Sequence, residues 1–174
     1  MRKTIFRLAL ITIAVLLVAI APAAAQTGTV VRVDPAFMQV VPDAPFTLTI
    51  QIDDVENLYA YDILLSFPPD KLEVVSASNG DFLEGPFLVD LITPDNEAGT
   101  VTAIVSQRNP AEPQSGNGTL VVITFHALGD RTDADIVLSE VTLSDDNGFA
   151  IPCSLRSGRV HIGAYPLYLP LVLR

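Results

Sequence analysis

The chain has 174 residues, with 20 Asp and Glu side chains against 10 Lys and Arg, and its formal net charge is −10. This length is enough for one domain with a sizeable hydrophobic core. The acidic balance argues against a nucleic-acid partner, because binding DNA or RNA depends on Lys and Arg neutralising phosphates. A single Cys excludes an intramolecular disulfide and a zinc site built from several thiolates.

Residues 1–25 have the layout of a secretory signal peptide. A basic start contains Arg2, Lys3 and Arg7. An apolar run over residues 8–20 and the small residues Ala23–Ala25 follow it. The run is shorter than the about 20 residues that span a bilayer, although an uncleaved anchor helix is the alternative. We therefore predict export, a secreted or cell-surface location, and no stable membrane span after cleavage.

From residue 30 onward, apolar and polar residues alternate with a period of two, which is the pattern of half-buried β-strands. Clusters of Gly, Asn, Asp and Pro separate the segments and favour turns. Many short strands with polar turns favour a sandwich of antiparallel sheets. We predict an all-β fold of nine strands within a domain over residues 27–163. The segments are 30–33, 46–52, 59–67, 72–76, 87–92, 100–106, 119–127, 136–143 and 159–162.

The last eleven residues, 164–174, differ in kind from this domain. They are apolar and are interrupted by Pro166 and Pro170. The segment is too short to span a bilayer. Two interpretations stay open: an edge strand that packs back on the sandwich, and an exposed tail recognised by export or surface-attachment machinery.

The sequence offers little for catalysis. A hydrolase needs a nucleophile with a base, or an acid and base pair. The two histidines, His126 and His161, stand at no spacing that indicates a triad. We expect the protein not to be an enzyme. For the lone Cys153 we expect a packed small hydrophobic side chain.

Two acidic clusters raise the question of calcium, which carboxylate oxygens bind outside cells. The first contains Asp53, Asp54 and Glu56, and the second covers residues 145–147. Neither follows the twelve-residue loop of an EF-hand, and Asp-Asn-Gly also favours a turn. We therefore expect no cofactor, with structural calcium as the alternative.

Three predicted strands place apolar side chains on the side opposite to the core. With residues 63, 65 and 67 pointing inward, Asp62 and Leu64 point outward, and the same rule applies to the segments 87–92 and 100–106. Apolar side chains set among carboxylates on an outer face favour a protein-binding surface. The alternative is that another segment, such as the tail, covers them. Ile92 also points outward, and the residues predicted for partner binding are Asp62, Leu64, Leu88, Asp90, Thr102 and Ile104.

The order and spacing of several segments resemble a cohesin domain. The longest segment is Leu-Tyr-Ala-Tyr-Asp-Ile-Leu-Leu-Ser-Phe-Pro-Pro, at 58–69. The resemblance implies a nine-stranded jelly-roll sandwich, related in fold to carbohydrate-binding modules, that holds calcium-bearing dockerin modules of secreted enzymes on a sheet face. The other segments are 33–35, 46–50, 71–76, 80–83, 99–102, 116–120, 123–127 and 143–148.

One residue role is implied by position within this resemblance. Many cohesins of the first type carry Asn-x-Asp on the third strand, where the Asp bonds the dockerin. Asp62 stands at that Asp position, but Ala60 stands where the Asn would be. The resemblance therefore implies a secreted, non-catalytic module that docks a dockerin-type partner in extracellular polysaccharide-degrading or surface assemblies. Direct polysaccharide binding is the alternative, although a chain without Trp offers few flat aromatic platforms.

Overall fold

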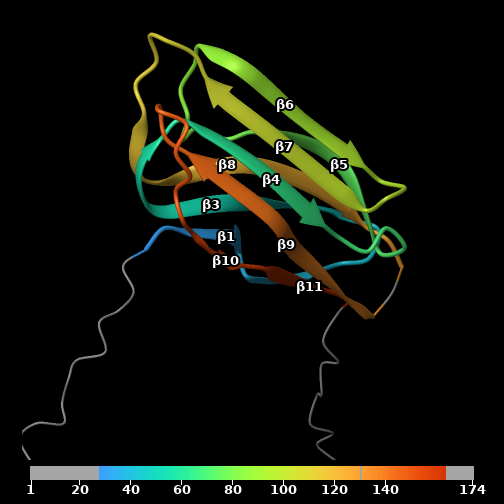
Figure 1. Cartoon of the computed structure of the whole chain (residues 1–174). Helices are drawn as coiled ribbons and strands as arrows, with labels where there is room; N and C mark the ends of the chain where they lie inside the picture. Colours follow the sequence, from blue (N-terminus) through green and yellow to red (C-terminus); the bar gives the residue numbers. More distant parts are fainter. Residues whose placement is uncertain (1–27, 130, 164–174) are drawn as a thin grey trace, which may run out of the picture.

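Two β-sheets face each other in the computed structural model, which describes residues 28–129 and 131–163 (Figure 1). The predicted signal peptide and the tail over residues 164–174 lie outside the described residues. In the described part of the chain, no helix has the length and apolar character needed to cross a membrane. The all-β sandwich predicted from the sequence is confirmed.

The smaller sheet has five strands in the order β10-β1-β3-β8-β5, and the larger has six in the order β2-β11-β9-β4-β7-β6. In the smaller sheet the strands are β1 (Val30–Asp34), β3 (Pro45–Leu58), β5 (Leu72–Asn79), β8 (Gln114–Ala127) and β10 (Ser154–Arg156). In the larger sheet they are β2 (Phe37–Val40), β4 (Ala60–Ser66), β6 (Phe87–Asp95), β7 (Thr100–Gln107), β9 (Thr132–Ser144) and β11 (Gly158–Ile162).

All nine predicted segments are strands, and the structure adds β2 and β10. These two strands contain only four and three residues, too few to show an alternating pattern. Each pairs in parallel, β2 with β11 and β10 with β1, so both sheets are mixed rather than purely antiparallel. The chain passes from the smaller to the larger sheet between β1 and β2 and again between β10 and β11. These two connections join the sheets along the side of the sandwich where the four strands lie.

The core fills the space between the sheets with side chains from alternate strand positions. Phe125 on β8 lies at its centre and is fully buried. Its ring stacks on Phe46 with 5.6 Å between centroids and meets the edge of Phe67 at 5.4 Å. Burying one large apolar side chain contributes about 1.5–3 kcal/mol. This layer of side chains fixes the register of the strands and therefore decides which residues face outward.

Candidate protein-binding face

Strands β4 and β7 lie side by side in the larger sheet, and their register places the predicted residues on its outer face. Asp62 pairs with Ile104, and Leu64 pairs with Thr102. The intervening residues Ile63 and Ala103 are buried. The predicted outward orientation of Asp62, Leu64, Thr102 and Ile104 is therefore confirmed, and the four side chains form two adjacent rows.

Strand β9 extends both rows on the other side of β4. Thr142 pairs with Asp62, and Glu140 pairs with Leu64. Directly paired residues in a sheet point to the same face, so a second carboxylate joins this surface. Alternation along β9 does not reveal the outward position of Glu140, because the register shifts by one residue opposite Leu64 and Leu65.

On β6 the predicted phase is wrong. Phe87 pairs with Gln107, but the next pair is Val89 with Ser106, which leaves Leu88 as an extra residue. One extra residue reverses the alternation of every residue after it. Asp90 and Ile92 therefore point toward the inner side, opposite Val105 and Ala103.

The outward residues of β6 are Val89, Leu91 and Thr93. Leu91 pairs with Ile104 and is 51 % exposed, so it continues the row that contains Asp62. Leu88, at the bulge, is 68 % exposed but belongs to neither alternating set. Of the predicted binding residues, the structure thus gathers four on one face and separates Leu88 and Asp90 from them, together with Ile92, which was predicted to be outward.

The charge of the exposed Asp90 acts on the buried phenol of Tyr61. Tyr61 is 2 % exposed, and its hydroxyl lies 2.7 Å from the Leu120 carbonyl oxygen and 2.7 Å from Asn79 Oδ1. Burial raises the pKa of Tyr61 strongly, and the negative charge of Asp90 raises it further. This interaction agrees with the inward phase of Asp90 and argues against a place for it on the outer face.

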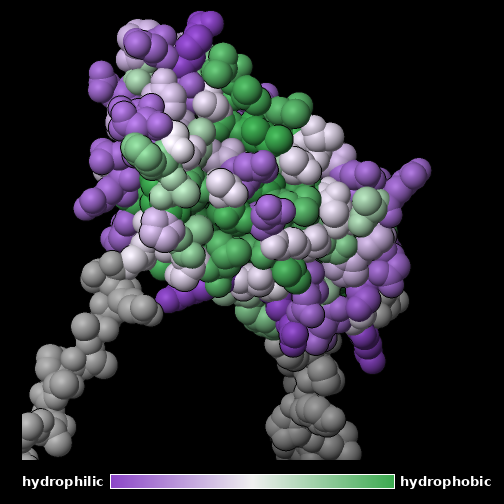
Figure 2. Space-filling model, in the orientation of Figure 1, coloured by the Kyte–Doolittle hydropathy of each residue, from purple (hydrophilic) through white to green (hydrophobic). Residues whose placement is uncertain are grey.

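The resulting face combines apolar side chains with carboxylates. Its apolar part comprises Leu64, Val89, Leu91 and Ile104, and its acidic part comprises Asp62 and Glu140. Strands β4, β6, β7 and β9 contain no Lys or Arg. Figure 2 shows hydrophobic residues gathered over β6, β7 and β4, with hydrophilic residues toward the ends of the sheet. Such a surface fits an apolar partner bordered by positive charge.

The other candidate chemical groups lie apart from this face and from one another. His126 is on β8 of the smaller sheet, whereas His161 is on β11 of the larger one. His161 Nδ1 lies 2.6 Å from Asp133 Oδ1, which lowers the pKa of that carboxyl. The two imidazoles therefore share no site.

Both acidic turns considered for calcium are engaged in local contacts. Asp53 accepts a hydrogen bond from Arg32 Nε at 2.7 Å. Asp145 Oδ1 accepts from the backbone N–H groups of Asn147 and Phe149, at 2.9 and 2.8 Å. Across residues 28–129 and 131–163, no three His, Cys, Asp or Glu side chains are grouped in a way that could hold a metal ion.

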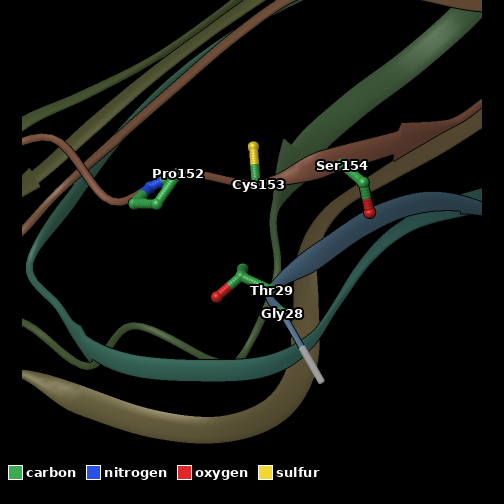
Figure 3. Close-up of a pocket in the computed structure, with 5 residues that line it drawn as sticks. All are labelled: Gly28, Thr29, Pro152, Cys153 and Ser154. Atoms are coloured by element: carbon green, nitrogen blue, oxygen red, sulfur yellow. The ribbon is translucent and has the colours of Figure 1, made fainter. Parts of the chain in front are cut away.

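Cys153 lines a small pocket where the start of β1 meets the segment before β10 (Figure 3). The pocket also contains Gly28, Thr29, Pro152 and Ser154, and in Figure 3 the sulfur atom points away from Thr29. Cys153 packs against the hydrophobic core, and burial raises the pKa of its thiol. A protonated, half-buried thiol behaves as a small hydrophobic side chain.

The fold and this face can be compared with known proteins. The sequence model of the family described as "Cohesin domain" matches residues 24–162. The chain belongs to the cohesin domain family. Cohesins are non-catalytic protein-binding modules, so this chain is a binding module and not an enzyme. No curated protein matches the sequence.

Several solved cohesin structures share the fold at low sequence identity. A non-cellulosomal cohesin from the archaeon Archaeoglobus fulgidus has 16 % identity and a TM-score of 0.65, over 79 % of this chain and 92 % of that one. The sixth cohesin of Acetivibrio cellulolyticus scaffoldin B, solved with a Cel5 dockerin mutant, has 15 % identity and a TM-score of 0.67, over 78 % and 99 %. The Clostridium thermocellum Coh-OlpA–Doc918 complex has 12 % identity and a TM-score of 0.69, over 78 % and 99 %.

Proposed function

We propose that this cohesin is a secreted adaptor that docks a dockerin-type module on the outer face of β4, β7 and β6. One observation carries the proposal: Leu64, Leu91 and Ile104 lie on the outer face of adjacent strands of a cohesin sandwich, Leu91 exposed and the other two half-buried. Apolar side chains in this position do not contribute to the core, and a partner that buries them gains binding energy. The complexes of related folds with dockerins support the same class of partner.

Asp62 orients the partner within this face. It lies in one row with Ile104 and Leu91, so a charged group of the partner that reaches it stands beside the apolar contact. A charge-assisted hydrogen bond is stronger than a neutral one and has a defined direction. Ala60, at the position where related cohesins carry Asn, pairs with Ser106 and offers no side-chain hydrogen bond. Recognition therefore relies on Asp62 and the apolar row.

Calorimetric titration of the full chain with a panel of dockerin modules in calcium tests the proposal. We expect saturable binding, micromolar or tighter, that is lost in chelator because dockerins carry the calcium. Asp62→Ala should weaken it by about 1.5–3 kcal/mol. Thr47→Ala, on the outer face of the other sheet, is the matched control and should bind like the parent. Absence of binding across the panel would contradict the dockerin assignment.

Two further outcomes separate the alternatives. Retention of the chain on insoluble cellulose, chitin or xylan would favour direct polysaccharide binding instead of an adaptor. The extracellular location rests on the predicted signal peptide, and the N-terminal sequence of the protein recovered from culture medium tests it. A mature terminus near residue 26 is expected, whereas retention of the chain inside the cell would contradict export.

A further inference from the structure

The four outermost strands of the two sheets differ in how their free edges are protected. Strands β2 and β10 are too short to template another strand. On β5, the side-chain amide of Asn96 accepts from the Val74 N–H at 2.8 Å and donates to the Val74 C=O at 3.1 Å, and a bulge follows at Val75. Strand β6 has nine residues and β7 as its one neighbour (Figure 1). A bulge at Leu88 and Pro94 lie near the two ends of β6, and between them residues 89–93 form the longest regular stretch of free edge in the described part of the sandwich.

The register shows which backbone groups of β6 are free. Phe67 N–H donates to the Gly99 C=O, and Gln107 N–H donates to the Tyr59 C=O. In an antiparallel ladder these bonds mean that the backbone groups of Thr102 and Ile104 point away from β4, toward β6. Leu91 and Thr93, which pair with them, therefore direct their backbone groups to β7. Asp90 and Ile92 direct theirs to the open edge.

Side chains on β6 make this edge attractive to another strand. Leu88, Val89 and Leu91 are 68 %, 37 % and 51 % exposed. The strand contains no Lys or Arg, the residues that most often discourage edge pairing. Pro94 has no N–H, but, like Asp90 and Ile92, it directs its backbone toward the free edge, so it leaves the β7 ladder intact and removes one donor near the end of that edge.

We propose that a second copy of this chain occupies the edge, so that two β6 strands pair antiparallel about a two-fold axis at Leu91. In this register, Asp90 and Ile92 of one copy exchange backbone hydrogen bonds with Ile92 and Asp90 of the other. Leu91 meets Leu91 of the second copy on the outer face. Asp90 stands opposite the uncharged Ile92 of the second copy, so no like charges are directly opposed at the centre of this register.

The expected interface is small. A strip about 30 Å long and about 10 Å wide on each copy amounts to roughly 600 Å² in total, which is below the usual size of a stable interface. The dimer is therefore weak and depends on concentration. It joins two six-stranded sheets edge to edge and places two partner-binding faces on one continuous surface. The dimer requires no dockerin, so its test is independent of the proposed function.

Sedimentation velocity of the full chain, from low-micromolar to near-millimolar concentration, measures the association. We expect the weight-average mass to rise toward that of a dimer, and more steeply at high salt because the net charge of −10 opposes association. Leu91→Lys should abolish the rise. Val75→Lys, a similarly exposed site on β5, is the matched control and should leave it unchanged. A constant monomer mass throughout would overturn the proposal.

A cysteine scan in a Cys153→Ser background tests the register itself. In an antiparallel sheet, two directly opposite residues that exchange no backbone hydrogen bonds have Cα atoms about 4.5 Å apart. A disulfide can join two residues at this distance. Leu91→Cys should therefore cross-link to itself on oxidation. Val89→Cys, which faces Thr93 of the second copy, should not. A dimer that survives Leu91→Lys, or equal cross-linking at both positions, would place the contact elsewhere and overturn the inference.

Discussion

The outer faces of the two sheets are built from the same alternating pattern but carry different chemistry. On the smaller sheet, Thr47 and Thr124 are hydrogen-bonded through their hydroxyls at 3.2 Å, and Gln51 donates to Thr49 and Thr119. Polar side chains here bind one another. On the larger sheet, the corresponding rows contain leucine and isoleucine. Folding requires only that the inner positions be apolar, so the difference marks the larger sheet as the surface suited to contact with a partner.

The carboxylates of the candidate binding face also differ from those of the smaller sheet in their ion pairs. On the smaller sheet, Arg32 binds Asp53 with 2.7 Å between Nε and Oδ2 and also contacts Asp34. In the described part of the chain, no ion pair involves Asp62 or Glu140. The larger sheet has an ion pair between Arg159 on β11 and Asp135 on β9, but a partner with Lys or Arg can approach Asp62 and Glu140 without displacing an internal cation.

Of the substitutions that test whether the two outer faces differ, Ile104→Lys is expected to have the largest effect on partner binding. The change places a long charged side chain in the middle of the apolar row, and it should weaken dockerin binding by about 2 kcal/mol or more, as at an interface hot spot. Thr124→Lys makes the equivalent change on the smaller sheet and should leave binding unaltered. Calorimetric titration of both variants decides the matter, after circular dichroism has shown that both fold. Equal losses would mean that the faces are not distinct.

A medium effect is expected inside the sandwich, one residue away from Asp62. Tyr61→Phe removes a buried hydroxyl that hydrogen-bonds, and it should lower the free energy of unfolding by about 1 kcal/mol without changing partner binding. Urea denaturation at neutral pH measures the first quantity, and calorimetry measures the second. A loss of binding as large as that of Asp62→Ala would show that the inward side chains of β4 also affect partner binding.

The buried phenol of Tyr61 also predicts that the free energy of unfolding falls at alkaline pH. Burial raises the pKa of Tyr61 above the ordinary value of 10.0 for a tyrosine, so the neutral phenol is favoured in the folded state. The contribution of the neutral Tyr61 phenol to the free energy of unfolding is fully present below about pH 10. It is lost as the pH rises further, because the phenol ionises first in the unfolded chain. Denaturation at increasing pH should show this decline in the parent protein and a flatter profile in Tyr61→Phe.

The smallest effect is expected for Thr47→Val on the polar face. It breaks the hydroxyl pair with Thr124, but both groups reach water, so the free energy of unfolding should change by no more than about 0.5 kcal/mol. Partner binding should remain that of the parent. Thermal denaturation and the same calorimetric assay check the two statements, and a marked change in binding would assign a role to the face that we consider inert.

Much of this architecture could be predicted from the sequence, and the failures have a common cause. The outward positions of Asp62 and Ile104 followed from strict alternation, because β4 and β7 pair without interruption. Asp90 was misplaced because one extra residue interrupts β6, and a bulge leaves no mark in a pattern of alternating hydrophobicity. Glu140 was missed for the same reason, since β9 carries its own shift opposite Leu64.

The bulge at Leu88 also bears on how such a module can change its specificity. On a regular strand, exchanging the side chains offered to a partner requires several substitutions. Here a single inserted or deleted codon would reverse the parity of β6, withdraw Val89 and Leu91 from the outer face, and present Asp90 and Ile92 in their place. The amino-acid composition of the strand would hardly change, whereas its surface would turn from apolar to mixed. Length variation in this strand is thus a short route between cohesins that choose different partners.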